Sequence, residues 1–221
     1  MSFILNIDTS TEVASVFLTE GGNIVFSEIN EVQKEHASFV HMAIQNVLNA
    51  SNKSVHDLKA VAVSCGPGSY TGIRVGMATA KGLCYSLNIP LIMINTLEIL
   101  ALAATLKTKE KHFYYAPMID ARRMEVYTGL YDHEGKEITK PAALILNQES
   151  FSKILEDKQV VFCGSGIKKL QEILKHVNAI FVVEPDQQSA MAKLSDKHYS
   201  ENDFADLVSS EPLYLKDLYE G

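Results

Sequence analysis

Long apolar runs and paired cysteines are both missing from this sequence of 221 residues. The longest apolar runs, such as residues 60–65, fall far short of the roughly 20 residues that a membrane helix needs. The N-terminus reaches Asp8 without a basic stretch followed by an apolar one, so we expect no signal peptide, no membrane association and a cytoplasmic protein. Cys65, Cys84 and Cys163 form no Cys-x-x-Cys pair, which fits a reducing compartment and excludes a thiolate zinc site of ordinary spacing.

Basic charge is also scarce, because 20 Lys and Arg residues stand against 27 Asp and Glu residues, a net charge of −7. Affinity for a nucleic-acid backbone comes largely from cationic side chains that displace counterions. This balance therefore counts against unaided binding of RNA or DNA. The acids are concentrated after Val183, where residues 184–221 hold nine acids and three lysines. We interpret this segment as an acidic tail.

The two halves of the sequence share one order of predicted elements. In the first half, short runs rich in Val, Ile and Phe predict antiparallel strands at 3–8, 13–19 and 24–29, then a helix at 34–51, a buried strand at 60–65, a glycine-rich loop, a helix at 73–87, a strand at 91–94 and a helix at 96–106. The second half repeats this plan with strands at 113–120, 124–131, 137–146, 160–163 and 180–183 and a helix at 167–175. This duplication predicts an α/β protein with two lobes, 1–107 and 108–221, each a mixed sheet with a β-meander and flanking helices.

An aspartate ends the first strand of each predicted lobe, Asp8 in the first and Asp120 in the second. Two such lobes resemble the actin, Hsp70 and sugar-kinase superfamily, the ASKHA or ribonuclease H-like folds. The resemblance implies that Asp8, Asp120 and Arg122 lie near a nucleotide, since carboxylates suit Mg²⁺ and neighbouring hydroxyls and amides suit phosphate. The alternative is ordinary turn formation, and the pair Arg122–Arg123 is equally open to a solvated hairpin or to contact with an anion or an acidic partner.

Glycines recur between Gly66 and Gly76, in the stretch GPGSYTGIRVG, although each glycine inside a helix costs about 1 kcal/mol relative to alanine. The stretch lacks the Gly-Lys-Ser/Thr of a P-loop, and Thr71 stands where a dinucleotide fingerprint has its last glycine. Pro67 stands where a nucleophile elbow needs glycine. We therefore interpret these glycines as packing residues.

The two predicted helices at 34–51 and 72–87 carry small or apolar residues that suit close contact with another chain. The predicted interface residues are Phe39, Met42, Ala43, Gly72, Gly76 and Ala80. We expect Gly76→Leu to leave the chain folded and to abolish co-purification of a partner.

Four segments, at 7–11, 66–76, 119–127 and 212–216, together resemble the bacterial TsaB family. The most specific of them is the loop motif with Gly66, Pro67, Gly68, Ser69, Tyr70, Thr71 and Arg74. The resemblance implies a non-catalytic, actin-like scaffold and dimerisation subunit of the machinery that puts threonylcarbamoyl on N6 of adenosine 37 in tRNAs that read codons beginning with adenine. It also implies a TsaD-type catalytic paralogue and a TsaE-type ATPase as partners, contacts through the first two helices, a homodimer when the chain is alone, and tRNA reached only through the complex.

One departure from the catalytic paralogue carries a functional expectation. Its His-x-x-x-His metal pair aligns by position with Thr96 and Leu100, and neither side chain replaces an imidazole on iron or zinc. We therefore expect no metal, no cofactor and no catalytic residues in this chain, with ATP, threonylcarbamoyl-AMP and the metal held by the partner subunits. Two alternatives stay open: an actin-like kinase or ATPase that uses Asp8, and a stand-alone RNA-binding module.

Overall fold

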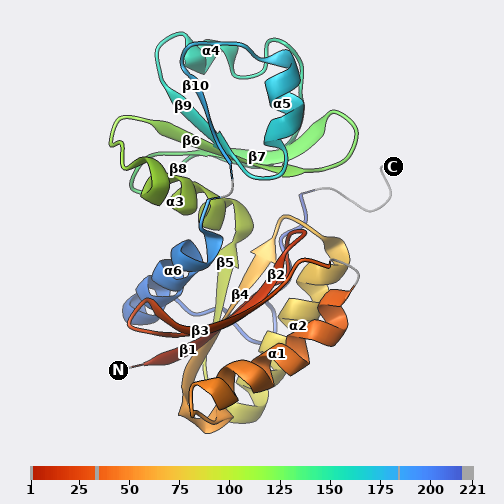
Figure 1. The fold of residues 1–221 in the computed structure, drawn as a ribbon, viewed down its shortest axis with the longest axis vertical. Helices are drawn as coiled ribbons and strands as arrows, with labels where there is room; N and C mark the ends of the chain where they lie inside the picture. The colour runs from red at the N-terminus through yellow and green to blue at the C-terminus, as the bar shows by residue number, and fades with distance from the viewer. Residues whose placement is uncertain (1, 33–34, 184, 216–221) are drawn as a thin grey trace. The chain divides into compact units, whose positions relative to one another are not determined.

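The computed structural model describes residues 2–32, 35–183 and 185–215, and the chain divides into two compact units (Figure 1). The first unit comprises Met1–Thr96 together with Gln188–Leu213, and the second comprises Leu97–Gln187 together with Tyr214–Gly221. Within the described residues, no helix is both long and apolar enough to cross a membrane.

The first unit is built on a five-stranded mixed sheet in the order β3-β2-β1-β4-β5. Its strands are β1 (Phe3–Asp8), β2 (Ala14–Glu20), β3 (Asn23–Asn30), β4 (Leu58–Gly66) and β5 (Leu91–Asn95). The first three form an antiparallel meander, and β4 and β5 add parallel strands to β1. The helices are α1 (His36–Ala50), α2 (Tyr70–Leu87) and α6 (Gln187–Glu201), with a short 3-10 turn, η2 (Val55–Asp57).

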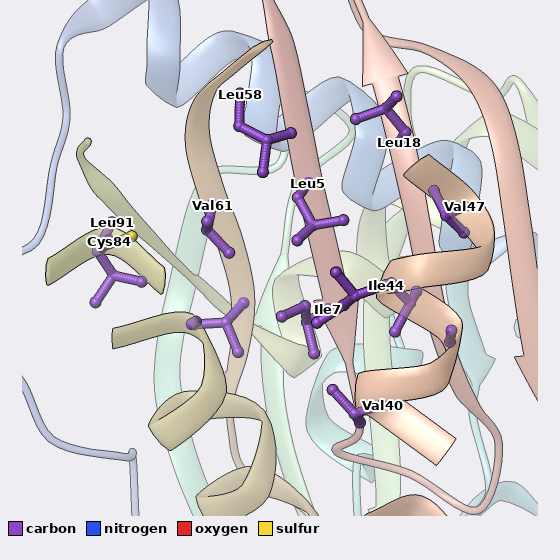
Figure 2. Close-up of a cluster of buried hydrophobic side chains, with 14 of the residues drawn as sticks. Leu5, Ile7, Leu18, Val40, Ile44, Val47, Leu58, Val61, Cys84 and Leu91 are labelled. Carbon is purple, nitrogen blue, oxygen red and sulfur yellow. The ribbon is translucent and has the colours of Figure 1, made fainter. Parts of the chain in front are cut away.

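The core of the first unit lies between this sheet and the helices α1 and α2. Figure 2 shows Val40, Ile44 and Val47 on one side of α1 turned toward Leu5 and Ile7 of β1. These three helix positions follow the i, i+4, i+7 spacing of an apolar face, which is why this segment forms a helix on the sheet. The helix predicted at 34–51 is confirmed, as α1.

The second unit repeats the plan with a sheet in the order β10-β9-β6-β7-β8. Its elements are α3 (Thr96–Thr108), β6 (Tyr114–Asp120), β7 (Glu125–Tyr131), β8 (Glu137–Ile145), α4 (Ser152–Leu155), β9 (Val160–Cys163), α5 (Ile167–Ile173) and β10 (Ala179–Val182). Strands β6, β7 and β8 are antiparallel, whereas β9 pairs in parallel with both β6 and β10. Two lobes, each a mixed sheet with a meander and flanking helices, confirm the predicted fold class.

The chain divides differently from the predicted lobes 1–107 and 108–221. Helix α3 belongs to the second unit because Leu97 and Leu100 pack in one cluster with Tyr115 of β6. The predicted acidic tail is corrected as well. Most of it consists of α6 and the segment 202–213, here called the strap, which belong to the first unit. In the strap, Ala205 N–H donates to the Leu91 carbonyl at 2.9 Å, and Leu213 N–H donates to the Cys65 carbonyl at 2.8 Å.

Candidate functional site

Asp8, at the carboxyl end of β1, is buried, and one of its carboxylate oxygens is hydrogen-bonded within the chain. Its Oδ1 accepts hydrogen bonds from the Ser10 amide at 3.1 Å, the Ser10 hydroxyl at 2.7 Å and the Ser64 hydroxyl at 2.7 Å. Ser64 lies on the neighbouring strand β4, so the carboxylate ties the turn after β1 to that strand. The turn-forming alternative therefore describes the contacts that Asp8 makes.

The glycine loop packs directly onto this turn. Ser69 N–H donates to the Ser10 carbonyl at 2.7 Å, and a Cβ on Gly68 would overlap that same carbonyl. One turn into α2, the Thr9 hydroxyl donates to the Gly72 carbonyl at 2.7 Å, and a Cβ on Gly72 would overlap the Thr9 carbonyl. The glycines are therefore packing residues, as the sequence predicted, but the backbone that they admit is that of the chain's own β1–β2 turn.

This packing corrects the predicted interface. A Cβ on Gly76 would overlap the Thr9 hydroxyl, and Ala80 and Ala43 are buried in the core of the first unit. Gly72, Gly76, Ala80 and Ala43 therefore face the chain's own interior rather than a partner. A leucine at position 76 would disrupt the fold, contrary to the expectation from the sequence.

The motif loop leaves only its helical end exposed. Thr71 and Arg74 are exposed at the start of α2, and the Arg74 guanidinium lies 3.8 Å from the centre of the Tyr70 ring. Ser69 caps the helix, because its hydroxyl accepts the Gly72 N–H at 3.3 Å. The other end of the motif is covered, since a Cβ on Gly66 would lie 2.7 Å from the Leu213 carbonyl.

In the second unit, Asp120 also has partners within the chain. Its Oδ1 accepts from Lys169 Nζ at 2.8 Å and from the Arg122 amide at 2.7 Å, and its own N–H donates to the Ser165 hydroxyl at 3.1 Å. Arg122 and Arg123 are exposed, with φ angles of +70° and +45°. The predicted proximity of Asp8, Asp120 and Arg122 to a nucleotide stays a prediction, because these contacts all lie within the chain.

A groove runs between the outer sides of α1 and α2. It is lined by His41, Ile44, Ala78, Thr79, Gly82 and Leu83. Beside it, Met42 on α1 is 60% exposed and Tyr85 on α2 is 82% exposed, whereas Phe39 packs partly against the core. Of the predicted interface residues, Met42 is therefore the one whose side chain is mostly free on this surface.

Within the described part of the chain, neither steric contacts nor backbone conformation requires a glycine at position 82. Around a Cβ built on it, the described residues place no heavy atom within 4 Å outside its local helix, and its φ angle is not positive. An exposed glycine inside a helix costs about 1 kcal/mol relative to alanine. Sequence reasoning missed this residue, although the spacing of Ala78 and Gly82, four residues apart, was a signal for a second small-residue line on α2.

The positions that correspond to the metal pair of the catalytic paralogue do not fit a metal ion. Thr96 and Leu100 are both buried, and Leu100 packs in the apolar core of the second unit. Among the residues that the structure describes, no three His, Cys, Asp or Glu side chains are grouped to hold a metal. A hydroxyl and an aliphatic chain offer no ligand set for iron or zinc.

The chain is similar in sequence and in structure to known proteins. A family model described as TsaD, tRNA N6-adenosine threonylcarbamoyltransferase, matches residues 22–217. The "tRNA threonylcarbamoyladenosine biosynthesis protein TsaB" of Bacillus subtilis is 32% identical over 79% of this chain and 76% of its own length. The protein of the same name from Escherichia coli is 29% identical over 97% of this chain and 94% of its own. YeaZ from Pseudomonas aeruginosa, a solved structure at 24% identity, superposes with a TM-score of 0.80 over 97% of this chain and 100% of its own.

The duplicated meander lobes have an actin-like fold, which a solved inorganic polyphosphate/ATP-glucomannokinase from Arthrobacter shares at 12% identity and a TM-score of 0.51 over 90% of this chain and 100% of its own. The family model covers nearly the whole chain. The chain belongs to the threonylcarbamoyltransferase family and, inside it, to the TsaB proteins.

Proposed function

We propose that this chain is a non-catalytic subunit of the cytoplasmic complex that transfers threonylcarbamoyl to N6 of adenosine 37 in tRNAs reading codons that begin with adenine. The names of its relatives support the pathway, and the match to a transferase family supports a TsaD-type chain as catalytic partner. A TsaE-type ATPase completes the proposed complex, tRNA is bound through the partners, and the chain pairs with a second copy when it is alone.

The observation that carries the non-catalytic role is the occupation of the Asp8 turn by the chain itself. Asp8 Oδ1 already accepts three hydrogen bonds, and the loop at Gly68 and Ser69 lies on the Ser10 carbonyl. A metal ion that bound through Oδ1 would have to displace these hydrogen bonds. This disfavours the alternative of an actin-like kinase or ATPase.

Docking to the TsaD-type partner is assigned to the groove between α1 and α2. Its exposed apolar residues, Met42 and Tyr85, flank a floor at Ala78 and Gly82 that has no side chain beyond Cβ. Helix axes pack 8–10 Å apart depending on the side chains at the contact, and glycine permits the closest approach. A partner helix that crosses α2 at Gly82 would use the space that the missing side chain leaves.

The test is Gly82→Leu in the full chain, co-expressed with the TsaD-type subunit of the same organism. Because the site is open, we expect the variant to fold and to melt no lower than wild type, while co-purification of the partner is lost. Ser200→Leu, at an exposed position of α6, is the matched control and should retain the partner. The isolated wild-type chain, titrated with ATP and Mg²⁺ in a calorimeter, should give no micromolar binding and no turnover. Retained partner in Gly82→Leu contradicts the docking face, and ATP turnover contradicts the non-catalytic role.

A further inference from the structure

The turn from Asp206 to Ser210, within the strap that follows α6, exposes an apolar side chain while hydrogen bonds hold its backbone. Asp206 Oδ1 accepts hydrogen bonds from the Val208 amide at 3.1 Å, the Ser209 amide at 2.7 Å and the Ser209 hydroxyl at 2.7 Å, and Ser210 N–H donates to the Asp206 carbonyl at 3.0 Å. Val208 is nonetheless 90% exposed. Nothing in the turn's own structure uses the valine side chain.

The same turn is anchored to α2. Lys81 Nζ donates to the Ser210 carbonyl at 3.0 Å and lies 3.4 Å from the Val208 carbonyl. Just before it, Ala205 and Leu207 pack against the core of the first unit. These contacts hold the backbone of Val208 beside α2.

Helical geometry places this turn on the side of α2 opposite α1. Successive residues of an α-helix are about 100° apart, so Lys81 and Leu83 lie on opposite sides of Gly82. Leu83 lines the groove with α1, and Lys81 holds the turn. The outer line of α2 at Ala78 and Gly82 is thus a floor between two walls, α1 on one side and the turn with Val208 on the other. Tyr85, one helical turn beyond Lys81, adds a second exposed apolar group.

We propose that the turn 206–210 is the second wall of the docking site, and that Val208 contacts the helix of the TsaD-type partner that lies along Ala78 and Gly82. This rests on the proposed function, because the occupant is the same partner on a surface continuous with the α1–α2 groove. The surface between α1 and the turn suits an apolar helix. Ala78 and Gly82 are uncharged, and the charge of Lys81 is directed to the turn carbonyls. Because hydrogen bonds already hold its backbone, Val208 would lose little conformational freedom when a partner buries it.

The chain supplies a matched control. Val177, in the connection between α5 and β10 of the second unit, is 89% exposed. Val208→Glu and Val177→Glu therefore make the same change in size and charge at equally exposed positions. Neither should alter thermal unfolding, because neither side chain is packed.

The experiment measures the Kd of the full chain for the purified TsaD-type subunit by calorimetry. We expect Val208→Glu to weaken binding at least tenfold and Val177→Glu to change it less than twofold. Lys81→Met, which frees the turn, should weaken binding by an intermediate factor. Binding of Val208→Glu at wild-type strength, or an equal loss in both glutamate variants, overturns the inference. Loss of self-association alone also overturns it, because the occupant is then a second copy. If Gly82→Leu abolishes binding and Val208→Glu does not, the proposed function stands and this inference fails.

Discussion

At the scale of single residues, α2 contains glycines in opposite surroundings. Gly72 admits the Thr9 carbonyl of the same chain, whereas Gly82 opens onto space that the described chain leaves empty. The first is a requirement of folding. Gly82 lowers the stability of the helix, and no contact with the described residues offsets this loss.

Alanine at these two positions should therefore shift stability in opposite directions. We expect Gly82→Ala to raise the free energy of unfolding by up to about 1 kcal/mol, the usual gain for an exposed helix position. Gly72→Ala should lower it by about 1–3 kcal/mol or more, because the new methyl group overlaps a backbone carbonyl that has no room to move. Urea denaturation of both variants measures this, and shifts of the same sign would contradict the assignment.

The close packing of α2 could be predicted from the sequence, but not the side of the helix on which it occurs. Both lines of α2, Gly72–Gly76–Ala80 and Ala78–Gly82, have the four-residue spacing of close packing. Which line faces the sheet depends on contacts with Thr9, far away in the sequence. Asp8 and its turn could be located from the local pattern, whereas its bond to Ser64 depends on the pairing of β1 with β4.

At the scale of elements, the two meanders and their glycine loops follow from local patterns, but α6 does not. Its buried residues, Ala190, Met191, Ala192 and Leu194, include few large apolar side chains among many polar neighbours. The segment therefore resembles a solvated tail. These small residues are buried only because α6 packs against the rest of the first unit.

The turn after α6 should depend on the charge of Asp206. Hydrogen bonds from the Ser209 hydroxyl and amide hold the pKa of Asp206 below its ordinary value of 3.8. A lowered pKa in the folded chain means that the carboxylate stabilises the turn above about pH 3.8 and that this contribution is lost as the pH falls below it. Asp206→Asn should reproduce the loss at neutral pH, seen as several-fold faster amide exchange at Val208 and Ser209.

Asp57 provides the control for this prediction. Its pKa is also lowered, by hydrogen bonds from Ser54 at the start of η2. Asp57→Asn should leave exchange at Val208 and Ser209 unchanged. Unchanged exchange in Asp206→Asn would show that the turn does not need its carboxylate.

At the scale of the whole molecule, the acidity belongs to the first unit rather than to a tail. That unit, residues 1–96 and 188–213, holds seven Lys and Arg residues against twelve Asp and Glu residues, while residues 97–187 hold twelve against thirteen. The division could not be read from the sequence, because it depends on contacts such as Ala205 with Leu91 that join distant segments. The acidity still supports the proposal that tRNA is bound through the partners.

Removal of the C-terminal segment should unfold one unit selectively. A variant ending at Asp186 loses α6 and the strap, so the apolar residues that Ala205, Leu207 and Leu213 cover become exposed. We expect hydrogen exchange to rise throughout β1–β5 and to change little in β6–β10. A variant ending at Leu215 is the control and should exchange like wild type. Full protection of β1–β5 in the shorter variant would contradict this division.

The return of residues 188–213 to the first unit also sets an order of events on the ribosome. Strand β1 joins a unit whose last parts, α6 and the strap, are synthesised only after the whole of β6–β10. Helices α1 and α2 are made before β6–β10, whereas the turn that faces α2 is made after them. A partner that requires all three will therefore select chains in which the strap has been synthesised over chains that stop before it.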